Sequence, residues 1–119
     1  MEQSQLISTF SKLTSRDKAI ALSRITFHLT IAARDIFFCS NYDDSDKVKR
    51  AIGISEINHR VTSSVISILK DEPRYPDDVL FNILIEIAEK HELVTYFTTI
   101  CANTLGKIAD ANPAAETSV

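Results

Sequence analysis

One long stretch of the chain, between Lys18 and Phe38, shows a clear helical period. Its apolar residues recur at steps of three and four, the spacing that places side chains on one face of an α-helix. This inner line consists of Leu22, Ile25, Leu29, Ala32 and Ile36. The sequence Thr14-Ser15-Arg16-Asp17 has the form of a capping box. We therefore predict a helix from near Ser15 to about Phe38.

A second apolar stripe lies on the opposite side of the same predicted helix and consists of Ile20, Phe27, Ile31 and Phe38. A helix that is apolar on two sides needs cover on both of them. That cover can come from other helices of the chain, from a second copy or from another protein. Cover from within the chain and cover from another chain fit the pattern equally, and we favour a second copy. These four residues, together with Arg74 and Tyr75, are the predicted interface.

The rest of the chain shows further helical lines. A short amphipathic segment contains Leu6, Ile7, Phe10 and Leu13 and should cap the core. A helix is expected over about Asp46–Lys70, where Val48, Ile52, His59 and Ile66 form a second line that widens the apolar face. Two more are expected, from Pro76 to His91 and from Val94 to about Ala109, and the break between them fits either a kink or a loop.

These elements predict an all-α fold, a single-domain bundle of four long helices plus a short N-terminal helix. The bundle should span residues 1–110 of the 119, with a flexible C-terminal tail over 111–119. Only two glycines and three prolines occur, which suits long helices. Gly53, inside the third long helix, marks either a weak point or a close helix contact.

Charge and composition exclude several classes of protein. The net charge of −3 and the absence of a basic stripe argue against nucleic-acid binding. Lys47, Lys49 and Arg50 form the one basic cluster, and we interpret it as a solvated helix start behind an acidic turn. No apolar run reaches the ~20 residues that cross a bilayer, and no signal-like start is present. We expect a soluble, cytoplasmic protein with no membrane partner.

Candidate chemistry is sparse. Cys39 and Cys101 are too far apart for a thiolate metal site, so we expect two reduced thiols, with Cys101 buried and Cys39 at a helix end, and no metal or cofactor. No phosphate-binding glycine loop, CxxC pair or nucleophile elbow occurs. Arg24 and His28 stand too close together for the Arg-His motif of HEPN nucleases. The sequence therefore offers no positive case for an enzyme.

The most suggestive polar stretch is Glu56-Ile57-Asn58-His59-Arg60-Val61, in which Glu56 and Arg60 are spaced to pair across one helical turn. It resembles the phosphoacceptor box of one class of sensor histidine kinases, where a glutamate precedes a His-Arg pair on a dimerising helix. The resemblance covers only this segment, and Thr62-Ser63 stand where that class usually has Lys-Asn. It implies that His59 accepts a phosphoryl group. The alternative is a structural histidine at a helix edge.

Arg74 and Tyr75 lie between two prolines in a stiff loop, which serves either as a recognition loop or as a rigid cover for the end of the bundle. We predict a small helical interaction or regulatory protein without enzymatic activity, acting as a homo-oligomer, most simply a homodimer. The alternative is an accessory protein that uses a histidine site, with Glu56, His59 and Arg60 as its polar residues and His59 as phosphoacceptor or ligand.

Overall fold

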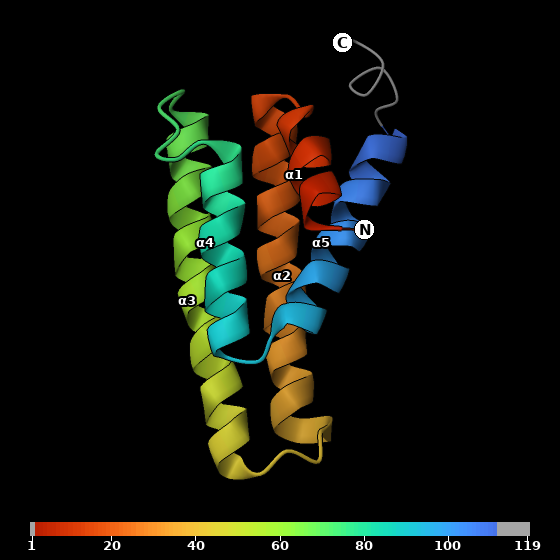
Figure 1. The fold of residues 1–119 in the computed structure, drawn as a ribbon, viewed down its shortest axis with the longest axis vertical. Helices are drawn as coiled ribbons and strands as arrows, with labels where there is room; N and C mark the ends of the chain where they lie inside the picture. The colour runs from red at the N-terminus through yellow and green to blue at the C-terminus, as the bar shows by residue number, and fades with distance from the viewer. Residues whose placement is uncertain (1, 112–119) are drawn as a thin grey trace.

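Two long antiparallel helices, α2 (Ser15–Cys39) and α3 (Asp44–Leu69), form the frame on which the other elements pack (Figure 1). The computed structural model describes residues 2–111. Within that range the remaining helices are α1 (Gln3–Ser11), α4 (Asp77–Lys90) and α5 (Val94–Ala111), and no strand occurs. The predicted all-α, single-domain bundle with a short N-terminal helix is confirmed. The predicted tail lies outside the described residues except for Ala111, which ends α5.

Side-chain caps define where the two long helices begin. The Thr14 hydroxyl oxygen accepts a hydrogen bond from the backbone N–H of Asp17 at 3.1 Å, as the capping-box sequence predicted. The Asp43 carboxylate accepts from the backbone N–H of Asp46 at 2.8 Å. Because Asp43 is the cap, α3 starts at Asp44, slightly earlier than the apolar pattern alone indicated.

Left-handed residues end α3 and α4. Asp71 has φ 56° and Glu92 has φ 57°, the conformation in which helices commonly terminate. The backbone N–H of Leu93 donates to the Ala88 carbonyl oxygen at 2.7 Å and closes the end of α4. The break between α4 and α5 is therefore a tight turn rather than a kink, and the two helices run in opposite directions (Figure 1).

The core is formed by the inner faces of all five described helices. Every residue of the predicted inner line of α2 is buried, and so are Phe97, Cys101, Leu105 and Ile108 of α5. In α1, Leu6 and Phe10 are fully buried, and the Phe10 ring meets the Phe81 ring edge-on at 5.0 Å. The short N-terminal helix thus caps the core against α4 and α5, as predicted.

The loop-side ends of α2 and α3 project beyond the turn between α4 and α5 (Figure 1). Phe37, Phe38 and Val48, near this projecting end, are exposed. Ile52, His59 and Ile66, which continue the second line of α3, are exposed as well. This second line of α3 therefore lies on the surface, because α2 and α4 pack against the other sides of the helix.

Candidate functional site

The second apolar stripe of α2, hereafter the outer stripe (Ile20, Phe27, Ile31 and Phe38), lies largely on the surface. Phe27 is 61% exposed, Phe38 is 84% exposed and Ile31 is 38% exposed, while Ile20 is partly buried against the core. Among the described helices, α2 packs chiefly against α3 and α5, which flank this stripe. The part of the chain that the structure describes therefore leaves Phe27, Ile31 and Phe38 of the outer stripe exposed.

An apolar groove runs beside the outer stripe, between α2 and α3, with a volume of about 420 Å³. Its apolar lining comes from both helices, and the polar residues are Arg16, Ser23 and Arg24. The apolar residues are Ala19, Ile20, Phe27, Val65 and Leu69. Exposed apolar surface rimmed by polar groups is typical of protein interaction sites. The groove joins two of the predicted interface residues, Ile20 and Phe27, to α3, which the sequence pattern did not indicate.

Ile31 faces a second cleft, of about 470 Å³, between α2 and α5. Arg24, His28 and Asp35 line it from α2, and its α5 side contributes Tyr96, Ile100, Asn103, Thr104 and Lys107. Burial raises the pKa of the Tyr96 hydroxyl, and the neighbouring Tyr42 hydroxyl adds to this effect.

Two groups of candidate residues that were predicted separately lie in one hollow, where α3 faces the α3–α4 loop. One group is His59 with Arg60 on α3, and the other is Arg74 with Tyr75 in the loop. This Arg60–Arg74 hollow has a volume of about 130 Å³ and is lined by His59, Arg60, Ser63, Arg74 and Tyr75. The Arg74 guanidinium donates a hydrogen bond to the Ser63 hydroxyl oxygen at 3.2 Å. Tyr75 packs partly buried against the core, whereas Arg74 is exposed. Tyr75 therefore covers the bundle end while Arg74 stays accessible.

Glu56 does not join this hollow. It lines a separate depression with Arg60, Glu86 and Lys90. Within residues 2–111 no ion pair joins Glu56 to Arg60, so the pairing expected from their spacing does not form. The structure brings His59 together with Arg60 in the hollow, while Glu56 shares only the neighbouring depression with Arg60. The phosphoacceptor role of His59 stays a prediction.

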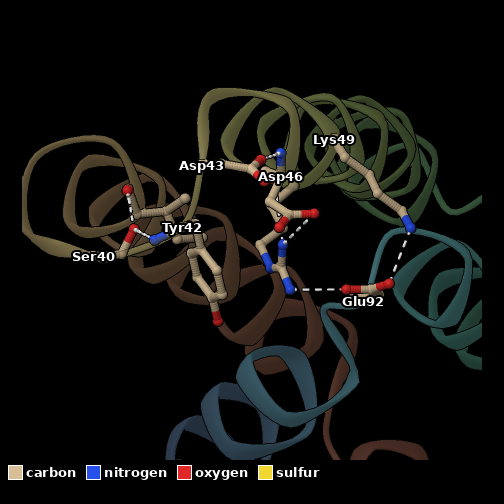
Figure 2. Close-up of polar contacts among 8 residues, drawn as sticks. Ser40, Tyr42, Asp43, Asp46, Lys49 and Glu92 are labelled. Carbon is tan, nitrogen blue, oxygen red and sulfur yellow. Dashed lines mark hydrogen bonds and ion pairs between the residues drawn. The ribbon is translucent and has the colours of Figure 1, made fainter.

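A buried arginine clamp at the projecting end was missed by the sequence interpretation (Figure 2). Arg50 is only 7% exposed; its guanidinium pairs with the Glu92 carboxylate at 2.9 Å and lies 3.8 Å from the centre of the Tyr42 ring. Lys49 pairs with the same carboxylate at 3.1 Å. The interpretation of this basic cluster as a solvated helix start is thus wrong for Arg50, because the α4–α5 turn folds over α3.

The ion pairs of Lys49 and Arg50 with Glu92 have a structural role. The hydrogen bond and positive charge of Lys49, with the charge of Arg50, hold the pKa of Glu92 below its ordinary value. These ion pairs connect the start of α3 to the α4–α5 turn. The turn also packs closely against Gly53, where a Cβ atom would collide with His91. A sequence signal for this contact does exist: Gly53 follows Arg50 by one helical turn, so both residues lie on the same face of α3. A glycine on a helix face indicates that another segment packs closely against that face.

The two free cysteines lie in different surroundings. Cys101 is buried, and burial raises the pKa of its thiol, whereas Cys39 is exposed at the last residue of α2, both as expected. Within the described range, no group of histidine, cysteine or acidic side chains is arranged to hold a metal ion. In that range there is also no helix with the length and apolar character needed to cross a membrane.

Comparison with protein-family models, with curated proteins and with solved structures finds no match to this chain. No family is assigned. Function is therefore inferred from the surface geometry alone.

Proposed function

We propose that this protein is a non-enzymatic interaction or regulatory protein that acts as a homodimer through the outer stripe of α2. The observation that carries the proposal is the exposure of Phe27, Ile31 and Phe38 along one line of a helix whose opposite face is fully used in the core. Fully burying each such side chain contributes roughly 1.5 to 3 kcal/mol, so a second copy that covers the stripe gains substantial stability.

The size of this face suits a stable dimer. With 25 residues, α2 is about 37 Å long, at about 1.5 Å per residue, and an α2–α3 pair is about 20 Å wide. The outer face of the pair therefore offers on the order of 700 Å². Stable protein–protein interfaces bury about 800 Å² per partner. A second copy seated on this face matches that requirement.

Charged residues at the edges of the outer stripe favour a two-fold axis parallel to α2. Arg16 and Arg34 lie roughly five helical turns apart on one edge, and Asp17 and Asp35 lie the same distance apart on the other edge, at about 3.6 residues per turn. A two-fold axis along α2 sets the arginine edge of one copy against the aspartate edge of the other. The same axis stacks each residue of the stripe on its own counterpart, as isologous interfaces do.

The test is the mass from light scattering, measured with circular dichroism on the same samples. The wild-type protein should be a dimer, and Phe27→Asp or Ile31→Asp should give a monomer that is still helical, because each places a carboxylate in the interface. Val79→Asp is the matched control, since Val79 on α4 is as exposed as Ile31, at 38%, and lies outside the stripe. This variant should remain a dimer.

Two outcomes contradict the proposal. A wild-type monomer at high concentration removes the homodimer. Unfolding of both Phe27→Asp and Ile31→Asp places the outer stripe inside the protein's own core.

A further inference from the structure

The Arg60–Arg74 hollow gathers positive charge without an acidic lining residue. Arg60, Arg74 and His59 line it, and the Arg74 guanidinium is hydrogen-bonded to Ser63, another lining residue. Within residues 2–111 none of these three side chains takes part in an ion pair. The nearby acids lie elsewhere: Glu56 lines the depression on the far side of Arg60, and Asp71 and Asp77 line another hollow beyond Tyr75. A hollow lined by one sign of charge attracts a counter-ion of the opposite sign.

The size of the hollow limits the ligand. Its volume of about 130 Å³ has room for about four water molecules, at about 30 Å³ each. Pockets for drug-sized organic molecules start at about 300 Å³. A hollow of this size suits a group as small as one tetrahedral oxyanion.

One donor, the Arg74 guanidinium, already has a hydrogen-bond partner that positions it. Ser63 on α3 accepts the hydrogen bond from Arg74 at 3.2 Å. Pro73 and Pro76 restrict the loop on both sides of Arg74, and Tyr75 packs partly against the core. A side chain that is already positioned loses less conformational entropy on binding. The planar fork of an arginine matches the geometry of phosphoryl oxygens, and arginine clusters are the usual phosphate readers.

We propose that the Arg60–Arg74 hollow binds a phosphoryl or sulfuryl oxyanion, with Arg74 and Arg60 as the charged donors and with Ser63 as the residue that positions Arg74. The group can be free inorganic phosphate or the phosphoester of a small molecule, because both present the same oxygens and about −1.5 to −2 charge at neutral pH. The hollow is formed by α3 and its following loop, so the proposal stands apart from the dimer formed through the outer stripe.

Nuclear magnetic resonance titration of the full chain at pH 7 tests the proposal, with inorganic phosphate, phosphoserine and sulfate as separate probes. Each should give saturable shifts of the Arg74 side-chain and His59 ring signals. Tighter binding of phosphoserine than of inorganic phosphate would identify an esterified ligand, and equal or weaker binding would identify the free ion. Arg74→Gln should weaken binding about tenfold or more, because it removes a charged donor.

Control variants distinguish binding in this hollow from binding to other arginines on the protein surface. Arg16→Gln removes an exposed arginine on α2, and it should leave the affinity unchanged. Phe27→Asp should also leave it unchanged, whatever its oligomeric state. Ser63→Ala should weaken binding less than Arg74→Gln does. The proposal is overturned if no probe gives saturable shifts at tens of millimolar, or if Arg74→Gln, still helical by circular dichroism, binds as tightly as the wild type.

Discussion

Gly53 on α3 lies directly against His91 in the α4–α5 turn: a Cβ atom placed on Gly53 would stand 2.5 Å from the His91 Cβ and 2.7 Å from a methyl carbon of Leu93. Gly53 therefore marks a close helix contact rather than a weak point in α3. One helical turn earlier on the same face, Arg50 binds Glu92 of the same turn. Because Gly53 has no side chain, the α4–α5 turn can pack directly against α3. The ion pair between Arg50 and Glu92 stabilises the turn in that position.

Gly53→Ala should lower the free energy of unfolding. Overpacking a filled site costs about 1 to 3 kcal/mol, which outweighs the gain in helix propensity of about 1 kcal/mol. Urea denaturation followed by circular dichroism measures the difference.

Gly106→Ala is the matched control, because a Cβ at that position of α5 would meet no side chain or other segment within 4 Å among residues 2–111. It should raise the free energy of unfolding by up to about 1 kcal/mol. If the two variants changed stability by the same amount, the contact between Gly53 and His91 would not be tight.

Glu92→Gln should destabilise the protein at pH 7 and do so less as the solution becomes acidic. Lys49 and Arg50 lower the pKa of Glu92 in the folded state, so its stabilisation is complete above the unfolded pKa of about 4.3. That stabilisation is lost as the pH falls through the lowered folded pKa. Denaturation curves of wild type and variant should therefore converge below about pH 4.

Glu89→Gln is the control for this pH dependence, since Glu89 is exposed and forms no ion pair within residues 2–111. Its stability difference from the wild type should be small at every pH. A constant gap between Glu92→Gln and the wild type down to pH 2 would mean that the ionised carboxylate does not provide the stabilisation.

Leu29→Ala should lower the free energy of unfolding by about 2 to 5 kcal/mol, because Leu29 is fully buried in the middle of the inner line of α2. Thr30→Ala, at the next and exposed position, serves as the comparison and should change stability by less than about 1 kcal/mol. Equal effects at the two positions would show that the core lies on a different side of α2.

A charge reversal at the edge of the outer stripe tests the direction of the proposed two-fold axis. Arg34→Asp sets like charges against Asp35 of a second copy and should shift the mass toward the monomer. The double variant Arg34→Asp with Asp35→Arg restores opposite charges in that dimer and should recover its mass. Light scattering at low ionic strength gives both masses. If the double variant were as monomeric as the single one, the parallel two-fold arrangement would be wrong.

Much of the fold could be predicted from local signals. The period of the inner line places Leu22, Leu29 and Ile36 in the core, because side chains three or four positions apart share one face of a helix. The start of α2 follows from Thr14 and Asp17, because a cap satisfies backbone donors within its own turn. These features depend on neighbours that are near in sequence, so spacing and residue type suffice to identify them.

The sites depended on contacts between distant segments. Arg50 and Glu92 are far apart in the sequence, so no helical spacing predicts their ion pair. A charged residue at either position is equally typical of a solvent-exposed surface. Likewise, Arg74 joins His59 and Arg60 only because the loop after α3 folds back over that helix. The sequence by itself determined which faces of the helices are apolar and, through the Thr14 cap, where α2 begins. Only the tertiary structure decided which faces meet, because packing selects among several partners that satisfy the same helical period.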